Sequence, residues 1–237
     1  MKQIIVYGKN VFNAIVEKRI KIYSIFVLES SSCLEIIKKK NLKYKICERK
    51  ELDNLTSKGN HQGVALLIDE FTYTPLDEMI RDSKKDGTIL ILDGIEDPNN
   101  LGAIIRIADA YALDGIIIAK DRQALVTSAV YHVSTGALLY TKIALVANLA
   151  NSIAKLKENG FWVVGAEANN NLSFNKVDYK DTKIALVVGS EGKGIGNLVS
   201  QKCDYLVNIQ MFGHVNSLNV SVATGILINE IVQKKRE

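Results

Sequence analysis

The sequence has few of the residues that mark a disulfide-stapled or metal-binding protein. Its 237 residues include 3 Cys, 3 His and 2 Pro. The cysteines are scattered and form no CxxC pair, which is typical of reduced thiols rather than of a disulfide framework. The histidines stand far apart and belong to no recognisable ligand cluster, so the sequence predicts no metal site.

Long apolar runs are also missing. No apolar stretch reaches the roughly 18 residues that a membrane span requires, and the start, MKQIIVYGKN, soon becomes polar again. We therefore expect a protein that is neither membrane-anchored nor exported and that acts in the cytoplasm. With 47% hydrophobic residues, the chain is nevertheless too apolar to be disordered.

The formal net charge of +4 is unevenly distributed. Residues 1–68 hold 13 Lys or Arg against 6 Asp or Glu, whereas residues 69–237 hold 17 against 20. A small basic region joined to a larger acidic one favours contact of the basic part with a polyanion such as nucleic acid. A solvated lysine-rich surface would give the same pattern, so charge alone leaves both interpretations open. The densest cluster consists of Lys38, Lys39, Lys40, Lys43 and Lys45.

Helix and strand patterns divide the chain into two α/β domains. Residues 1–68 predict a compact domain near the lower size at which a core is stable alone. Residues 69–87 contain one of the two prolines and are the most polar stretch nearby, so they are predicted as a linker. Residues 88–237 predict the larger domain. In the small domain we expect helices at about 9–18, 31–37 and 48–55, and strands at 22–28, 44–48 and 61–68.

Six short, almost continuously apolar runs predict the strands of the larger domain, at 88–93, 115–120, 141–146, 161–167, 183–189 and 205–210. Strands that are apolar on both faces belong to a mostly parallel sheet with helices above and below. The segments between them predict helices at about 98–112, 126–134, 148–159, 194–201 and 219–235. The predicted fold class is α/β.

Ligands of parallel α/β sheets bind where strands end and loops lead into helices. After the strand at 88–93, Asp97 followed by Pro98 predicts a helix start, with a capping carboxylate and then proline in the first helical position. Arg106 lies further along this helix on a polar face. It can be a surface partner of Asp109, or it can contact a phosphate or hydroxyl group of a substrate, and the spacing leaves both open.

The second such loop is glycine-rich and reads GSEGKGIG from Gly189. It is no Walker A motif, because Val187 stands at the place of the first glycine and Gly194 follows the lysine. It is no dinucleotide fingerprint either, because Asn197 occupies the third glycine's place. Glycines allow close approach of a ligand to backbone N–H groups, but a tight turn would also require them.

The third loop, IQMFGHVNSLNVS, leads into the last helix. Ser217 or Asn219 is predicted to cap that helix. The small, polar, turn-prone residues of this loop would also suit a ligand that is held by backbone groups.

Together, the segments DPNNLGAIIRIADA, ALVVGSEGKGI and NIQMFGHVNSLNVSVATG resemble the three motifs of the SpoU (TrmH-type) RNA 2′-O-methyltransferases of the SPOUT superfamily, in the family's order and spacing. The resemblance covers about residues 88–237. The N-terminal part resembles the small L30e-like substrate-binding domain of the branch that methylates large-subunit ribosomal RNA. Tyr7-Gly8 and His61-Gln62-Gly63 carry that likeness.

The resemblance implies a SPOUT-type parallel sheet with a C-terminal trefoil knot, although chains generally avoid threading. It implies S-adenosylmethionine as the methyl donor, no metal, and a homodimer whose active sites form across the interface. The implied reaction is methylation of a ribose 2′-hydroxyl, at a guanosine of 23S ribosomal RNA.

The resemblance also implies roles for individual residues. The catalytic polar set would be Asn100, Arg106, Glu191, Ser217 and Asn219, with Arg106 the residue most tied to catalysis. The methyl-donor set would be Gly189, Ile209 and Leu218, with Ser190, Gly192 and Met211 beside them. Gln210 departs from the family, which commonly has proline there.

Three alternatives stay open to different degrees. A transfer-RNA methyltransferase of the same family is disfavoured by the N-terminal domain, which that branch typically lacks. An adenosine-specific ribosomal RNA methyltransferase would share both domains. A catalytically silent RNA-binding ribosome-assembly factor would have no chemical need for the full polar set.

Overall fold

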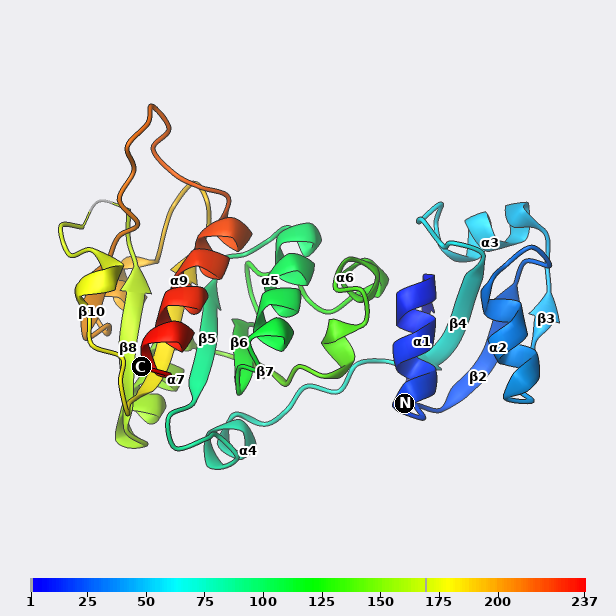
Figure 1. Ribbon diagram of the computed structural model, residues 1–237, viewed down its shortest axis with the longest axis horizontal. Coiled ribbons are helices and arrows are strands. Elements are labelled where there is room, and N and C mark those ends of the chain that lie inside the picture. Colours follow the sequence, from blue (N-terminus) through cyan, green and yellow to red (C-terminus); the bar gives the residue numbers. More distant parts are fainter. Residues whose placement is uncertain (1, 169) are drawn as a thin grey trace. The chain divides into compact units, whose positions relative to one another are not determined.

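The computed structural model describes residues 2–168 and 170–237 and divides the chain into two compact units (Figure 1). The first unit contains the chain up to Thr72 together with Val126–Tyr140, and the second contains Tyr73–Leu125 and Thr141–Glu237. Within the described ranges, no helix is long and apolar enough to cross a membrane.

A four-stranded sheet in the order β1-β4-β2-β3 forms the centre of the first unit. Strand β4 pairs antiparallel with β1 and β2, and β3 runs parallel to β2. The strands are β1 (Gln3–Tyr7), β2 (Ile22–Val27), β3 (Lys45–Ile46) and β4 (Val64–Asp69), and the helices are α1 (Lys9–Glu17), α2 (Cys33–Lys39) and α3 (Arg49–Leu55). All of these elements except β1 are predicted from the sequence.

The first unit also contains a segment that follows the second strand of the larger sheet in the chain. Helix α6 (Ser128–Val133) and the 3-10 turn Ala137–Leu139 belong to it. The Ser128 hydroxyl donates to the Ile5 carbonyl at 2.6 Å, and the His132 ring stacks on Tyr7 with centroids 5.1 Å apart. The sequence pattern places this segment in the larger domain, whereas its contacts lie with β1 and α1.

A six-stranded sheet in the order β10-β8-β9-β5-β6-β7 forms the second unit. Its strands are β5 (Thr88–Asp93), β6 (Gly115–Ala119), β7 (Ile143–Val146), β8 (Phe161–Ala166), β9 (Lys183–Gly189) and β10 (Tyr205–Val207). Every neighbouring pair is parallel. The predicted parallel α/β sheet is therefore confirmed.

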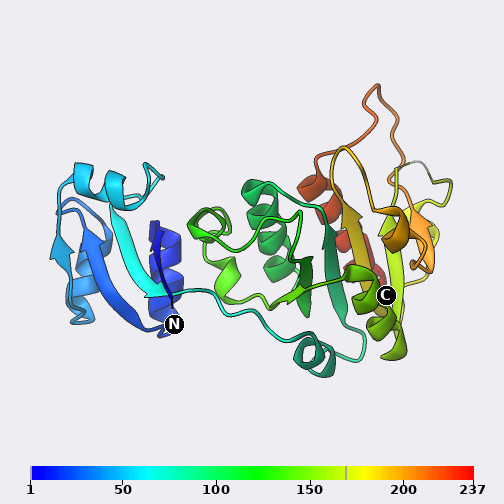
Figure 2. The ribbon, with the colours of Figure 1, turned by 180° about the vertical axis from the view of Figure 1, so that it is seen from behind.

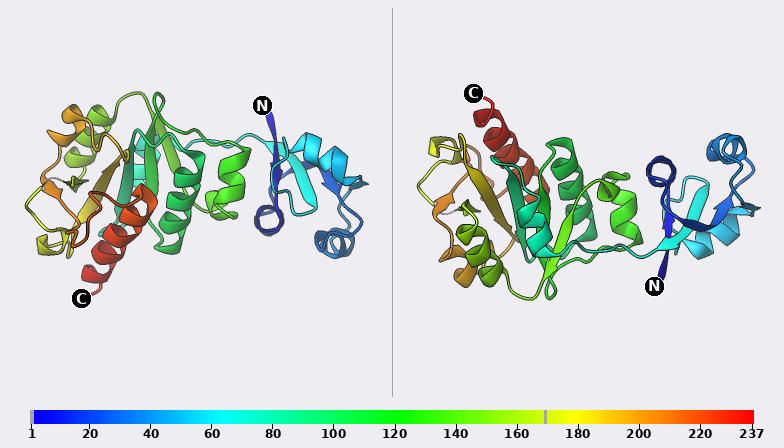
Figure 3. Two further views of the ribbon diagram at one scale, coloured as in Figure 1. Left: turned by 90° about the horizontal axis from the view of Figure 1, so that it is seen from above. Right: turned by 90° about the horizontal axis from the view of Figure 1, so that it is seen from below.

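Helices cover both faces of this sheet, as its apolar strands require. Helices α5 and α9 lie side by side on one face, and α7 lies on the other (Figures 1 to 3). The helices of the unit are α4 (Leu76–Arg81), α5 (Pro98–Ala110), α7 (Leu149–Glu158), α8 (Asn197–Ser200) and α9 (Val220–Lys234), and a 3-10 turn spans Phe174–Lys176.

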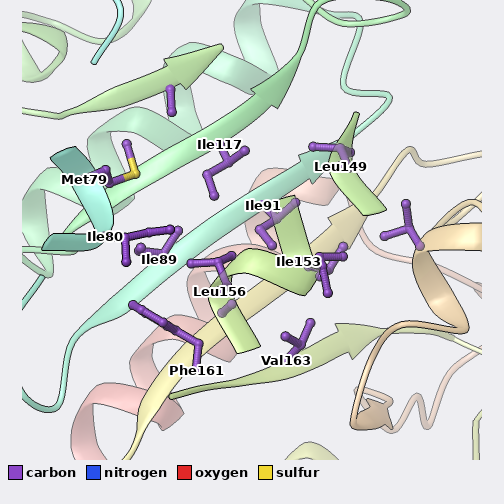
Figure 4. Close-up of a cluster of buried hydrophobic side chains, with 14 of the residues drawn as sticks. Met79, Ile80, Ile89, Ile91, Ile117, Leu149, Ile153, Leu156, Phe161 and Val163 are labelled. Carbon is purple, nitrogen blue, oxygen red and sulfur yellow. The ribbon is translucent and has the colours of Figure 1, made fainter. Parts of the chain in front are cut away.

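The core between α7 and the sheet is built from fully buried aliphatic side chains, including Ile91 and Leu156 (Figure 4). Met79 and Ile80 of α4 are buried in the same cluster. The stretch 69–87, predicted to be a linker, thus contributes a helix to the core. An apolar pattern of about one and a half helical turns, surrounded by polar residues, is too short to predict this helix.

The end of α9 is fixed to the start of β5. The Lys235 ammonium donates to the carbonyls of Asp86 (2.7 Å) and Gly87 (3.0 Å) and to the Thr88 hydroxyl (2.8 Å). Burial lowers the pKa of Lys235 to about 8, and the facing Asp86 and Asp114 act in the opposite direction. The strand pairings do not show whether the end of the chain passes through a loop. The trefoil knot therefore stays a prediction.

The three cysteines are free thiols, as the sequence predicts. Burial raises the pKa of Cys33 and Cys47, and it raises the pKa of Cys203 to about 11. A raised pKa disfavours the thiolate, which is the reactive form. These residues therefore have a packing role.

Candidate active site

The first two sequence motifs start side by side at the carboxyl edge of the six-stranded sheet. Strands β5 and β9 are neighbours, and Asp93 is paired with Gly189 at their ends. Beyond these residues the two loops stay joined, because the Gly196 N–H donates to the Asp93 carboxylate at 2.8 Å. The sheet topology therefore brings together two loops that follow residues 93 and 189 of the sequence.

Helix α5 starts as the sequence predicts. Pro98 is its first residue, and the Asp97 carboxylate accepts from the Asn99 N–H at 2.9 Å. This cap fixes the register of the helix, so that Asn100 lies in the first turn and Arg106 lies in the middle.

One residue from each of the three motifs meets in a hydrogen-bonded cluster. The Asn219 Nδ2 donates to Glu191 Oε1 at 2.6 Å and to Asn100 Oδ1 at 2.9 Å. The Asn100 Nδ2 and the Val220 N–H each lie 3.3 Å from the same Glu191 oxygen. We call Asn100, Glu191 and Asn219 the polar triad. It is the point at which the three segments converge.

Both the oxygen and the nitrogen of the Asn219 side-chain amide form hydrogen bonds. Its oxygen caps α9 by accepting from the N–H groups of Ser221 (2.9 Å) and Val222 (3.4 Å). Its nitrogen supplies the bonds to the rest of the triad, so the amide orientation is fixed by partners on both sides. Of the two predicted caps, the structure selects Asn219 over Ser217.

The glycine-rich loop folds back onto the end of its own strand. The Gly194 N–H donates to the Ser190 carbonyl at 2.9 Å, and Gly194 has a φ of 63°. A methyl group at Gly189 would lie 2.1 Å from the carbonyl carbon and oxygen of Gly194 and 2.3 Å from the Ile195 nitrogen. The glycine at 189 is therefore required by the turn itself, whatever ligand the turn holds.

A cavity of about 270 Å³ opens beside the triad. Four of the predicted site residues line it, Asn100, Ser190, Glu191 and Gly192. Sequence reasoning does not single out its other lining residues, Gly94, Ile95, Glu96, Lys193 and Val220. In the sequence, only their position within or beside the three motifs indicates that these residues belong to the site.

The predicted residues Gly189, Ile209, Met211 and Leu218 do not line this cavity. Ile209, Met211 and Leu218 belong to the loop 208–219 between β10 and α9 and are half-buried there. Among the described residues, none forms a backbone hydrogen bond with residues 209–218. The loop thus offers N–H and carbonyl groups to a ligand.

Arg106 and Ser217 form no hydrogen bond with the triad. Both are exposed, and neither forms a hydrogen bond or ion pair with another described residue. The surface pair between Arg106 and Asp109 that the sequence allows is not formed. The Arg106 guanidinium is thus available to bind a ligand.

Gln123 holds one wall of the cavity and is missed by sequence reasoning. Its Oε1 accepts from the Ile95 N–H at 2.9 Å, and the neighbouring Ala124 N–H donates to the Ile95 carbonyl at 2.8 Å. The Gln123 Nε2 is buried without a partner in the described part of the chain. It comes from the loop after β6, which carries no motif, so nothing local marks it. No group of three metal-ligating side chains occurs among the described residues.

Comparison with family models gives two matches. Residues 87–229 match the SpoU rRNA methylase family, and residues 5–74 match the RNA 2′-O ribose methyltransferase substrate-binding domain. A chain from Staphylococcus haemolyticus, assigned to the TrmH family of tRNA/rRNA methyltransferases, is 39% identical over 246 aligned residues. The alignment covers 100% of this chain and 98% of the relative.

Two solved structures are similar over nearly the whole chain. The S-adenosylmethionine-bound rRNA methyltransferase of Sinorhizobium meliloti is 26% identical, with a TM-score of 0.82, and the superposition covers 98% of this chain and 87% of that one. The SpoU methyltransferase AviRb of Streptomyces viridochromogenes is 22% identical, with a TM-score of 0.85, and the superposition covers 99% of this chain and 90% of that one.

Proposed function

The chain belongs to the SpoU rRNA methylase family, and we propose that it methylates the ribose 2′-hydroxyl of a guanosine in large-subunit (23S) ribosomal RNA. As a member of this family it is an S-adenosylmethionine-dependent RNA 2′-O-methyltransferase. The observation that carries the proposed chemistry is the polar triad, because it joins all three motifs at one cavity.

The choice of ribosomal RNA rests on the N-terminal domain. Residues 5–74 match a substrate-binding model, and the similar Sinorhizobium meliloti protein, named an rRNA methyltransferase, aligns with both units. We propose residues 1–68 as the RNA-binding domain, 69–87 as the connection and 88–237 as the catalytic domain. Ribosomal RNA is transcribed and assembled in the bacterial cytoplasm, so we propose that the chain acts there.

The residues present fit the methyl donor. The turn after Gly189 and the loop 208–219 expose backbone groups that can hold an adenine and a ribose, as the family pattern requires of Gly189, Ile209 and Leu218. Ser190, Gly192 and Met211 would flank them. S-adenosylmethionine, when bound, supplies a methyl group that is activated by its sulfonium charge.

Arg106 is proposed to act on the RNA hydroxyl. A guanidinium stays protonated in proteins, so it cannot remove the hydroxyl proton. It can donate charge-assisted hydrogen bonds that hold the neighbouring phosphate and stabilise the alkoxide as it develops. The absence of any partner for Arg106 among the described residues leaves its donors available for this.

The proton acceptor is proposed to be Glu191. Three donors meet its Oε1, whereas its Oε2 makes no hydrogen bond to a described residue. One carboxylate oxygen of Glu191 is thus held by hydrogen bonds, and the other is open to the substrate. Asn100 and Asn219 would orient the carboxylate. Ser217, near the end of the loop 208–219, would also contact the substrate.

A homodimer is part of the proposal. Helix α9 carries the exposed apolar residues Val222 and Ile226, which are 51% and 37% exposed, one helical turn apart on one face. Phe212 and Val215 of the preceding loop are 89% and 62% exposed. An apolar pair on one face of a helix and an exposed apolar loop are candidates for a contact surface. A second copy of the chain would cover them next to the active site.

Three lysines at the end of α2 in the first unit are proposed to bind RNA phosphates. Lys38, Lys39 and Lys40 are exposed. Replacing all three with glutamine should weaken RNA binding and flatten the dependence of log affinity on log salt, by about 0.7 to 0.9 for each phosphate that is no longer neutralised. The rate at saturating RNA should not change. Binding measured over a salt series tests this.

Lys45→Gln is the matched control, because Lys45 is already paired with Glu51 at 2.6 Å. Its removal should change the slope little. An unchanged slope in the triple variant would show that this surface does not contact RNA.

The target itself is tested by mapping 2′-O-methyl groups in ribosomal and transfer RNA from cells with and without the chain. We expect one guanosine of the large-subunit RNA to lack its methyl group when the chain is absent. If the missing methyl group lies in a transfer RNA, the chain is a transfer-RNA methyltransferase. If it lies on an adenosine of ribosomal RNA, the chain is an adenosine-specific ribosomal RNA methyltransferase. An unchanged map would indicate a silent RNA-binding factor.

A further inference from the structure

A second cavity lies at the opposite end of the six-stranded sheet. Its volume is about 250 Å³, and its lining consists of Lys85, Asn159, Gly160, Trp162, Asp181, Thr182 and Lys183. Trp162 and Lys183 stand at the beginnings of β8 and β9, whereas Glu191 of the polar triad follows the end of β9. The seven residues of β9 separate the two sites by about 20 Å along the strand. In Figure 1 the arrow of β8 points away from this end.

Trp162 is the most unusual residue of this cavity. Its neighbours Phe161 and Val163 are buried, whereas Trp162 is 48% exposed. Its indole stacks on Tyr205, with ring centroids 5.8 Å apart and an interplanar angle of 30°. Tyr205 does not line the cavity, so the stack backs the indole and leaves part of it facing the cavity. An aromatic side chain held in this way is a platform for another flat ring.

Two lysines supply positive charge beside the indole. Neither Lys85 nor Lys183 forms a salt bridge with a carboxylate in the described ranges, and the Lys183 ammonium lies 5.2 Å from the centroid of the Phe161 ring. Asp181 is the one carboxylate of the lining, so the cavity carries a net positive charge. Aromatic platforms combined with lysines that have no carboxylate partner are typical of sites for single-stranded nucleic acid.

We propose that this cavity binds one unstacked nucleotide of the RNA substrate, with its base on Trp162 and its phosphate near Lys85 and Lys183. The inference rests on the proposed function in one respect, since the ligand is part of the RNA that is methylated. The site would hold the strand at a point remote from the reacting ribose. Its contribution is therefore to RNA affinity and not to the chemical step.

Trp162 is the only tryptophan of the chain, so its fluorescence reports on this cavity alone. The full-length protein is titrated with a short single-stranded oligoribonucleotide, and binding is measured in parallel by filter retention. We expect quenching that saturates at the same concentration as binding. Unchanged emission while RNA binds would overturn the proposal.

Variants test the same site without the fluorophore. Trp162→Ala should weaken RNA binding about 5- to 150-fold, which corresponds to a stacking energy of about 1 to 3 kcal/mol per base. Trp162→Phe should retain most of the affinity, because it keeps an aromatic face. Equal affinity in Trp162→Ala and the unmodified protein would contradict the proposal, as would a protein partner that quenches Trp162 where RNA does not.

The lysines are tested by the salt dependence of binding. Lys85→Gln with Lys183→Gln should reduce the slope of log affinity against log salt by about 0.7 for each lysine. Lys142→Gln is the matched control, because Lys142 lies at the same end of the sheet but pairs with Asp82 at 2.8 Å. Equal slopes in the double variant and the control would contradict the phosphate contact.

These outcomes separate the site from the proposed function. Quenching by RNA without any methylation would leave the cavity assigned and remove the proposed activity. Normal methylation with no change in Trp162 fluorescence would support the proposed activity and contradict the assignment of the cavity.

Discussion

Replacing Arg106 with alanine is expected to lower the rate of RNA methylation about 10²- to 10³-fold, the decrease typical of removing one donor that stabilises developing negative charge. Arg106 is exposed on α5 and has no partner among the described residues, so its removal leaves no buried group unpaired. The fold and the affinity for S-adenosylmethionine should therefore be unchanged. Single-turnover methylation of RNA measures the rate, calorimetry measures the affinity for the methyl donor, and the thermal unfolding temperature checks the fold.

Two further variants define what Arg106 contributes. Arg106→Lys keeps the charge but removes the planar, two-pronged donor, so an intermediate rate would show that geometry matters. Asp109→Asn is the control, because Asp109 is exposed on the same helix and makes no ion pair with Arg106. A near-normal rate in Arg106→Ala would refute the assigned role.

Replacing Gly189 with alanine is expected to disrupt the methyl-donor site and to lower stability by about 1 to 3 kcal/mol, the usual cost of overpacking. The added methyl group would meet the backbone of Gly194 at 2.1 Å, and backbone cannot rotate away as a side chain can. The turn that carries Ser190, Glu191 and Gly192 must then shift. We expect neither S-adenosylmethionine binding nor methylation in this variant, as measured by calorimetry and a methylation assay, and a lower thermal unfolding temperature.

Gly225→Ala is the matched control for that variant. Gly225 lies within α9, and a methyl group there would only come within 3.5 Å of the Ile107 side chain, an ordinary contact. Alanine is also the better helix former, so stability should be equal or higher. If Gly189→Ala bound the methyl donor as tightly as the unmodified protein, the glycine turn would not be part of its site.

Much of the larger domain could be predicted because its signals are local. Each apolar run forms a strand of the parallel sheet, and Asp97 with Pro98 marks the start of α5. The convergence of Asn100, Glu191 and Asn219 was implied by resemblance to a family, not by spacing. The structure adds the reason, which is the pairing of β5 with β9 and the cap at the start of α9.

The remaining features depend on contacts between distant segments. Nothing in the sequence near Ser128 or His132 shows that they contact Ile5 and Tyr7 rather than the larger sheet. Gln123 acts on Ile95 from a loop without a motif. The polar composition of 69–87 conceals α4, because only Met79 and Ile80 of this short helix are buried in the core, with the partly buried Leu76 packed against it. Local pattern alone could not have identified any of these.

The proposed activity depends on a binding site for the methyl donor, which we propose to be formed by the turn after Gly189 and the loop before α9. It is tested by isothermal titration of S-adenosylmethionine into the purified full-length protein, alone and with RNA. We expect saturable binding that Gly189→Ala abolishes and Arg106→Ala leaves intact. No binding heat under either condition would contradict the assignment of this site.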